Sequence, residues 1–486
     1  MIIMILQLLI VLLALYVGSR YGSLALGAIS GIGLAIMVFG FGMKPGNPPT
    51  DVIYIIIAAV TCAGMLQASG GMDWLIQLAE KLLRRHPSHV TFLAPLCTFF
   101  LTVLVGTGHV VYTLMPIICD IALKKGIRPE RPCAVASVAS QVGIICSPIA
   151  AAVASFVIIS NMNNFDINNL QVICITLPAS LCGIGMAALF SYKRGKDLDK
   201  DPLFQARLKD PAMYEYMYGS TASVLDKKVD RSARIAVFIF VAALGIIMFF
   251  SVMQIIGCDI RPTYRTLQII KGVDDATKFG IGDVTLTAKQ ILNAKMEMEG
   301  CTQYVQKPLA MNLIIQIVMI AAAALMIICA KASPKKAVAG SVWQSGMVAV
   351  VAIYGIAWLA DTFFAGHVTE MHRILKQIVT DYPWAIAIAF FVVSVLINSQ
   401  GAVVVAMLPL AYSLDIPGPV LLGVLPSVYG YFFIPNYPSD IATVNFDRSG
   451  TTVIGKYLLN HSFMMPGFVS VVVSTLVGLL LTSLFY

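Results

Sequence analysis

Long apolar stretches alternate with short polar ones along almost the whole chain. The stretches run without polar–apolar alternation, so they predict α-helices rather than the strands of a β-barrel. Because about 20 apolar residues cross a bilayer core of roughly 30 Å as a helix, we expect about 12 spans. They lie at residues 2–18, 22–42, 51–69, 90–105, 132–160, 168–191, 235–257, 309–330, 338–360, 382–398, 416–434 and 466–485. The pattern predicts an all-α polytopic membrane protein.

The first apolar stretch resembles either a signal peptide or a transmembrane helix. No basic residue precedes it, and Arg20 follows it. A cleaved signal normally carries its positive charge before the apolar core. We therefore expect this stretch to stay in the protein as a span.

Two apolar stretches are interrupted in the same way in the two halves of the chain. GTGH at 106–109 runs on to Pro116, and NSQG at 398–401 runs on to Pro409, with the same spacing from glycine to proline. GIICSP, ending at Pro148, is similarly matched by GYFFIP, ending at Pro435. Paired Gly/Pro interruptions of this kind indicate a transporter whose substrate site is built from broken helices.

Two amphipathic segments add a third correspondence between the halves. Residues 72–86 and 367–380 are too charged to span a bilayer, and their apolar residues recur at helical spacing. We expect both to be interfacial helices, one before each interrupted region. Together the three correspondences predict an internal repeat.

Lysine and arginine set the expected orientation. Loop 192–234 is rich in both, so the positive-inside rule places it in the cytoplasm. One span at 235–257 then places loop 258–308 outside. The net charge of +8 is explained by such clusters and indicates topology rather than nucleic-acid binding.

The chain is therefore divided into two transmembrane halves, 1–191 and 309–486, joined by loop 192–234, span 235–257 and loop 258–308. Neither loop has enough apolar residues for an independent domain. A short amphipathic helix is expected within the outer loop, at 287–299.

Cys258 and Cys301 bracket the loop expected outside the cell. In an oxidising compartment they could form a disulfide that closes the loop. The alternative is two unpaired thiols near the membrane face. Most of the other cysteines lie in apolar stretches and are expected to pack as small buried side chains. No cysteine spacing fits a zinc site, and neither a metal nor a cofactor is expected.

The composition of the interruptions favours a small anion. A helix that begins inside a membrane presents unpaired N–H groups and a positive dipole end. Glycine allows close backbone approach, and Ser, Thr, Asn and Gln supply neutral hydrogen bonds. The candidate substrate-binding residues are Thr107, Gly108, His109, Ser147, Ser399, Gln400, Gly401, Asn436 and Ser439. The alternative is that these small residues serve only close helix packing.

Ionisable residues in apolar surroundings are candidates for coupling or regulation, since each is costly unless paired or hydrated. Asp361, Asp440 and Asp447 could hold a proton, a cation or an internal basic partner. Arg448 could clamp a substrate carboxylate or pair with Asp447. His109 could donate a hydrogen bond or relay a proton.

Enzyme motifs are missing from the sequence. There is no Walker A segment to power transport by ATP hydrolysis and no G-x-S-x-G hydrolase motif. His367, Glu370 and His372 do not have the spacing of a zinc-protease helix. The chain is expected to be a secondary transporter, not an enzyme.

Three segments resemble the anaerobic C4-dicarboxylate transporters of the Dcu family, DcuB-type exchangers most of all. They are IPNYPSDIATVNFDRSGTTVIGKYLLNHSFMMPG (434–467), GMVAVVAIYGIAWLADTFFAGH (346–367) and GTGHVVYTLMP (106–116). The resemblance implies an antiporter of the bacterial inner membrane that takes up fumarate, malate or aspartate against succinate in anaerobic fumarate respiration. It also implies inverted repeats with re-entrant hairpins, elevator-like transport and a homodimer.

The resemblance leaves two other functions open. Some DcuB-type proteins act as co-sensors with a membrane histidine kinase, which would make the Asp440 region regulatory. A cation-coupled symporter for another organic anion, such as citrate, is the third possibility.

Overall fold

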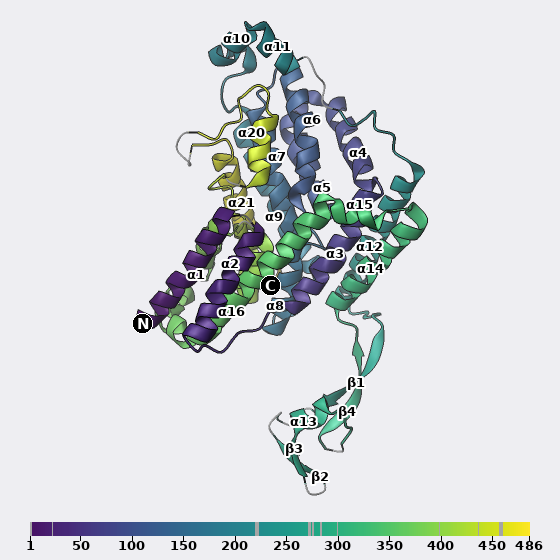
Figure 1. Cartoon of the computed structure of the whole chain (residues 1–486), viewed down its shortest axis with the longest axis vertical. Helices are drawn as coiled ribbons and strands as arrows, with labels where there is room; N and C mark the ends of the chain where they lie inside the picture. Colours follow the sequence, from purple (N-terminus) through teal and green to yellow (C-terminus); the bar gives the residue numbers. More distant parts are fainter. Residues whose placement is uncertain are drawn as a thin grey trace. The chain divides into compact units, whose positions relative to one another are not determined.

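The structure is a computed structural model, which describes residues 2–21, 23–218, 223–270, 274, 277–281, 284–298, 300–397, 399–435, 437–455 and 460–486. The chain forms two compact units. The main unit comprises 1–248 and 315–486, and the second unit comprises 249–314. Figure 1 shows that helices dominate the chain.

The helices are given in chain order. Those before the second unit's strands are α1 (Ile2–Tyr21), α2 (Ser23–Ala35), α3 (Thr50–Ala68), α4 (Gly71–Arg85), α5 (Val90–Val105), α6 (Val111–Lys124), α7 (Glu130–Val142), α8 (Ala151–Met162), α9 (Asn169–Tyr192), α10 (Pro202–Leu208), α11 (Pro211–Tyr218) and α12 (Arg231–Ile255). Those after them are α14 (Met311–Ala330), α15 (Pro334–Ala339), α16 (Ser341–Asp381), α17 (Ile386–Leu396), α18 (Gln400–Ser413), α19 (Gly418–Gly423), α20 (Pro438–Phe446) and α21 (Met464–Phe485).

Within the described part of the chain, seven helical segments are long and apolar enough to cross a membrane. An eighth is formed if α3 and α4, bent by 71° at their junction, count as one span. Four further apolar helices are shorter, at Ile3–Gly18, Gly27–Gly40, Pro383–Val395 and Gln400–Ser413. The structure therefore shows a polytopic helical protein with fewer full-length spans than the sequence predicts.

The expectation of a continuous span at 416–434 is wrong. This region holds the short helix α19, a 3-10 turn at Leu425–Val428 and then turns. Pro417, Pro419 and Pro426 lack backbone N–H donors, and Gly430 adds flexibility, so this region favours short helical turns over one long helix. The predicted span at 132–160 is likewise broken into α7, a 3-10 turn at Gly143–Cys146, and α8.

The same series of elements occurs in each half of the chain. A long helix (α3, or the first part of α16) leads into a second helix (α4, or the part of α16 after its kink at His367). An interrupted hairpin follows (α5–α6, or α17–α18), then a broken element (α7–α8, or α19–α20), then a full span (α9 or α21). This order supports the internal repeat, and the kink at His367 marks the start of the predicted amphipathic segment.

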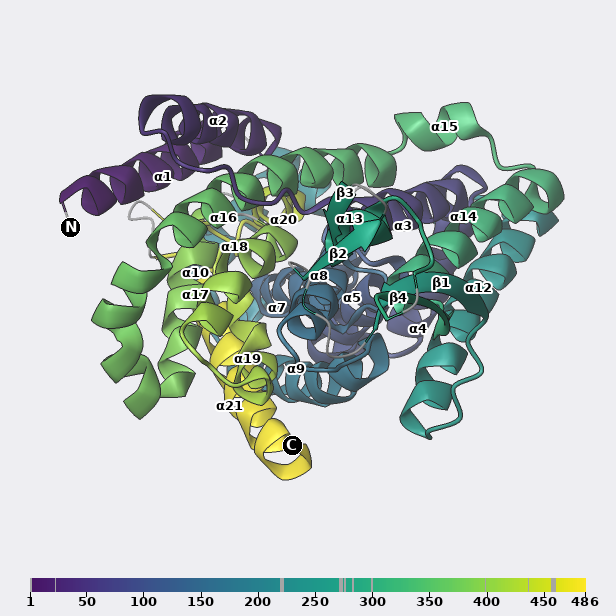
Figure 2. The ribbon, with the colours of Figure 1, turned by 90° about the horizontal axis from the view of Figure 1, so that it is seen from below.

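Two of the extensive helix packings in the main unit involve α16 and α21. Figure 2 shows α1 and α2 beside α16, and α9 packs along α21. A Cβ on Gly183 of α9 would lie 2.1 Å from the Ser474 hydroxyl and 2.4 Å from the Ser470 carbonyl of α21. Glycine here therefore serves close helix packing.

The broken elements lie inside the main unit. Every residue of α7 is buried, as are nearly all those of α18, whereas α12, α14 and α21 expose many apolar side chains. Interrupted backbone has unsatisfied polar groups, which a membrane tolerates only where protein or a water-lined cavity surrounds them. The burial of α7 and α18 meets that requirement.

Loop 192–234 is more ordered than a simple connection. It contains a 3-10 turn at Leu198–Lys200 and helices α10 and α11, which lie at one end of the main unit (Figure 1). Asp201 caps α10 by accepting hydrogen bonds from the N–H groups of Leu203 and Phe204.

The second unit departs from the predicted all-α fold. Strand β1 (Thr263–Ile269) pairs antiparallel with β4 (Thr302–Pro308), and β2 (Lys278–Ile281) pairs with β3 (Val284–Thr287). Helix α13 (Ala288–Asn293) lies within the predicted helix 287–299 and is capped by Thr287 and Gln290. The few apolar residues of this loop suffice for a compact unit because strand pairing satisfies the backbone around a small core.

Cys258 and Cys301 are free thiols in the structure, as in the second of the two alternatives for this pair. Cys301 is buried directly before β4, opposite the end of β1, whereas Cys258 is exposed ahead of the start of β1. At about 3.4 Å per residue, the length of β1 separates them by roughly 20 Å. A disulfide needs Cα atoms within about 7 Å, so the ribbon prevents the bond.

Candidate functional site

Both interrupted hairpins border one cavity of about 370 Å³ in the main unit. Gly106, Thr107, Gly108 and His109 line it from the α5–α6 hairpin. The α17–α18 hairpin lines it with Ser399, Gln400 and Gly401. Segments almost 300 residues apart in the sequence thus meet at one site, as the paired interruptions predict.

Each hairpin tip ends one helix and caps the next. Gly106 ends α5 in the left-handed conformation, with φ +81°, where glycine is favoured. Thr107 is extended, and its hydroxyl accepts a hydrogen bond from the His109 N–H at 3.4 Å. Ser399 caps α18 in the same way by accepting from the Ala402 N–H at 3.4 Å. The two tips therefore have equivalent Thr and Ser caps.

Four helical segments begin at the cavity. Gly108 starts the 3-10 turn that leads into α6, and Gln400 starts α18. Ala151 starts α8, and Pro438 starts α20. The first N–H groups of a helix lack partners within it, and its dipole is positive at this end. Both features favour an anion at the start of such a segment.

The described lining residues of the cavity include no Lys, Arg, Asp or Glu. His109 is the one described lining residue whose side chain can take up a positive charge. It forms a hydrogen bond through Nδ1 with the Thr107 hydroxyl. This contact gives His109 a local hydrogen-bonding role and orients its ring.

A polar network supports the second tip from the other half of the chain. The Gln400 amide donates to the Gln141 carbonyl at 2.8 Å and to the Tyr431 hydroxyl at 3.3 Å. Tyr431 in turn donates to the Gln141 side chain at 2.9 Å. Since Gln141 lies on α7, this network joins α7, α18 and the turn before α20.

Gly108 lies directly against this network. A Cβ on Gly108 would lie 2.4 Å from the Gln141 amide nitrogen. Gly401 has less tight surroundings, with Ala151 at 3.0 Å and Ile353 at 3.2 Å from a Cβ. Glycine at 108 is therefore required by close approach to a held side chain.

Sequence reasoning missed several lining residues. Gln344 and Ser345 of α16 and the rings of Tyr431 and Tyr437 also border the cavity. The two tyrosine rings contact each other at a centroid distance of 4.6 Å, with their planes tilted by 39°. Gln344 and Ser345 are polar residues at the start of an apolar span, and that signal could have identified them.

Some predicted residues lie behind the cavity wall. Ser147 is buried beside Gly106, and its hydroxyl has no hydrogen-bond partner in the described part of the chain. Ser439 and Asp440 directly follow the lining residue Pro438, and the Ser137 hydroxyl donates to Asp440 at 2.7 Å and to Ser439 at 3.2 Å. Asn436 lies outside the described residues.

Asp361 is placed away from the cavity. Its carboxylate accepts a hydrogen bond from the Asn47 N–H at 2.7 Å, and the neighbouring Thr362 accepts from the Gly46 N–H at 3.0 Å. Trp358 also donates to the Gly46 carbonyl at 2.8 Å. Asp361 thus anchors the loop before α3.

Asp447 and Arg448 do not pair with each other. Asp447 accepts hydrogen bonds from the turn that follows it, including the Thr452 N–H at 2.6 Å and the Thr451 hydroxyl at 2.9 Å. Arg448 instead lies 3.0 Å from Asp120 of α6. Both expectations for Arg448 missed this partner, because nothing local in the sequence relates residues 120 and 448.

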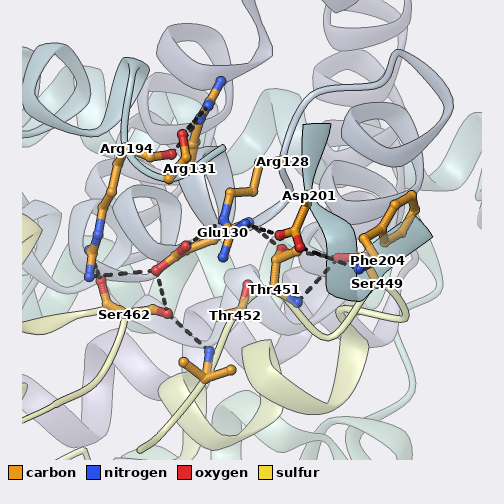
Figure 3. Close-up of polar contacts among 12 residues, drawn as sticks. Arg128, Glu130, Arg131, Arg194, Asp201, Phe204, Ser449, Thr451, Thr452 and Ser462 are labelled. Carbon is orange, nitrogen blue, oxygen red and sulfur yellow. Dashed lines mark hydrogen bonds and ion pairs between the residues drawn. The ribbon is translucent and has the colours of Figure 1, made fainter. Parts of the chain in front are cut away.

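A second polar network ties the segment after α20 to α7 and to loop 192–234 (Figure 3). The Glu130 carboxylate lies 2.7 Å from Arg128 and 3.5 Å from Arg194, and it accepts a hydrogen bond from the Ser462 hydroxyl at 2.9 Å. The Glu130 N–H donates to Thr451 at 3.1 Å.

Arg128 extends this network to α10 by pairing with Asp201 at 2.6 Å. Burial disfavours the charged Asp201, but hydrogen bonds from the Phe204 N–H and the Arg128 guanidinium outweigh it and lower the pKa of Asp201 below its ordinary value. The folded loop is therefore held on the main unit by charge-assisted contacts.

Comparison with known proteins identifies relatives over the full length. A family described as "Anaerobic c4-dicarboxylate membrane transporter" matches residues 3–486. The chain is 42% identical to the anaerobic C4-dicarboxylate transporter DcuB of Escherichia coli O157:H7, over 99% of the chain and 98% of the relative. It is 32% identical to the C4-dicarboxylate transporter DcuA of Wolinella succinogenes, over 97% of each, and 30% identical to DcuA of Escherichia coli strain K12, over 99% of each.

Proposed function

The chain belongs to the family of anaerobic C4-dicarboxylate membrane transporters, and from that premise we propose that it exchanges C4-dicarboxylates across the membrane through the cavity between its hairpin tips. The observation that carries the proposal is the start of four helical segments at a cavity whose described lining lacks charged side chains. Backbone N–H groups and neutral donors favour a small anion without binding it irreversibly.

The two equivalent tips suggest one binding place for each carboxylate. We propose that one carboxylate lies at the start of the helical segment that Thr107 caps, and the other at the start of α18, which Ser399 caps. Gln400, Asn436 and Ser439 complete the proposed set of substrate-binding residues. Ser439 is buried and directly follows the lining residue Pro438. Arg448 is left out of it, because Arg448 pairs with Asp120 and does not line the cavity.

Exchange follows from the charge of the substrate. When a dianion such as fumarate or malate replaces succinate, no net charge crosses the membrane and no ion gradient is needed. Aspartate carries a single net negative charge at neutral pH because of its ammonium group, so its exchange for succinate moves one charge. The proposed direction is uptake of fumarate, malate or aspartate against succinate, in the bacterial inner membrane during anaerobic respiration. A homodimer and an elevator-like movement of the cavity-bearing elements complete the proposal.

Counterflow in proteoliposomes tests this function. Vesicles that contain the purified protein and internal succinate should take up labelled fumarate much faster than vesicles loaded with a monocarboxylate. Labelled citrate should not be exchanged. Equal fumarate uptake with and without internal succinate would reject obligatory exchange.

A pH gradient separates exchange from proton symport. Asp440 is buried, and its carboxylate accepts a hydrogen bond from the Ser137 hydroxyl, so it is the candidate proton site for the symport alternative. We expect an inward proton gradient to produce no fumarate accumulation in unloaded vesicles, because exchange moves no proton. Proton-driven accumulation that disappears in Asp440→Asn would establish symport instead.

The co-sensor alternative has a separate test. Ser399→Ala removes the cap of α18 at the cavity. Loss of transport in this variant, with intact signalling to a membrane histidine kinase, would show that the chain also acts as a sensor. Loss of neither would remove Ser399 from the proposed binding set.

A further inference from the structure

A second cavity, of about 780 Å³, differs from the first because its lining is strongly basic. It is lined where α9 ends and loop 192–234 begins, and the turn after α6 completes it. Its basic side chains are Lys125, Arg131, Lys193, Lys196 and Lys200. Asp197 is the single acidic residue among the described lining residues.

Basic side chains outnumber acidic ones in the described lining of this cavity. Arg131 pairs with Asp197 at 2.8 Å and donates to the carbonyls of Arg194 and Gly195 at 2.8 and 2.9 Å. Asp197, the acidic residue of the described lining, is therefore already paired with Arg131. The four lysines are exposed, and no ion pair to any of them occurs within the described chain.

The cavity lies where apolar helix surface gives way to polar chain. Tyr192 is the last residue of α9, is 46% exposed, and packs its ring 5.4 Å from that of Phe92. Just before it, Leu189 and Phe190 are 58% and 46% exposed. Exposed apolar residues followed by a half-exposed tyrosine are typical of a helix that leaves the bilayer core at the headgroup level.

From this arrangement we propose that the cavity binds an anionic phospholipid of the leaflet on its own side of the membrane. The four lysines hold the phosphodiester headgroup, and the acyl chains lie along the exposed apolar face of α9. Clusters of basic residues at the cytoplasmic end of a span are suited to anionic headgroups. The positive-inside expectation for loop 192–234 places this cavity at the cytoplasmic leaflet.

Binding there has a structural consequence. The bound headgroup would contact the turn after α6, the end of α9 and the start of loop 192–234. Arg131, which also lines the cavity, donates a hydrogen bond to the Arg194 carbonyl. A ligand that binds only the folded state stabilises it. Anionic lipid is therefore expected to raise the thermal stability of the protein, independently of substrate.

The test uses the purified full-length protein in neutral detergent. Phosphatidylglycerol is titrated against the wild type, the variant Lys125→Gln/Lys193→Gln/Lys196→Gln/Lys200→Gln and a matched control. The control is Lys209→Gln/Lys228→Gln/Lys335→Gln/Lys336→Gln, which removes the same charge from exposed lysines that do not line this cavity. Native mass spectrometry counts bound lipid, and thermal unfolding measures stabilisation.

We expect the cavity variant to bind phosphatidylglycerol at least tenfold more weakly and to lose the thermal shift, while the control keeps both. Phosphatidylcholine should bind none of the three proteins appreciably. Equal weakening in the two variants would reduce the effect to general surface charge and overturn the site. A full thermal shift from inorganic phosphate alone would overturn the assignment to a lipid.

Discussion

Replacing Gly108 by valine is expected to lower the initial rate of dicarboxylate counterflow by about tenfold or more. The new Cβ would lie 2.4 Å from the Gln141 amide, which the Tyr431 hydroxyl helps to hold. Either the hairpin tip shifts or Gln141 leaves its network, and in both cases the start of the helical segment at the cavity moves. Counterflow of labelled fumarate measures the effect.

Gly185→Val is the matched control for this substitution. Gly185 lies in α9, and among the described residues no atom of a neighbouring element lies within 4 Å of a Cβ placed there. The control should keep the transport rate and should unfold at a similar temperature. If Gly108→Val transports as fast as Gly185→Val, the tip is not part of the substrate site.

Neutralising Asp120 should cause the largest loss of stability. Its fully buried carboxylate lies 3.0 Å from Arg448, 3.1 Å from Lys124 and 3.7 Å from Arg84. Asp120→Asn leaves these three cations together without their common carboxylate. Because the arginines keep some solvent contact, we expect a loss of about 2–4 kcal/mol in the free energy of unfolding. Denaturant titration in detergent measures it.

An exposed ion pair provides the comparison. Lys227 and Asp73 lie 2.6 Å apart, but their side chains are 58% and 30% exposed. Solvent screens such a pair, so Asp73→Asn should cost less than about 1 kcal/mol. Equal losses in the two variants would mean that Asp120 does not organise its three cations.

The location of the candidate site could be predicted from the sequence because its signal is local. Gly, Ser and Thr interrupt apolar stretches at 106–109 and 398–401. Gly106 ends one helix there, and Thr107 and Ser399 cap the helical segments that follow. Two interruptions in matching places then indicate one site, since the halves of a repeat meet. Both tips line one cavity, and its role as the substrate site stays a prediction.

The partners of charged residues could not be predicted in the same way. Arg448 was expected to bind substrate or Asp447, and it pairs with Asp120. Asp361 was a coupling candidate, and it accepts a hydrogen bond from the loop at Asn47. Such pairs depend on distances between helices that are far apart in the chain, and periodicity carries no information about those distances.

By itself, the sequence determined that this is a helical membrane protein with two interrupted regions suited to a small anion, since a bilayer leaves backbone groups no partners outside helices. Only the tertiary structure decided which further residues line the cavity, such as Tyr431 and Ser345, and where helices are too short to span. It also decided that loop 258–308 forms paired strands that keep Cys258 and Cys301 apart. These features depend on how segments far apart in the chain pack together, and no local sequence pattern encodes that packing.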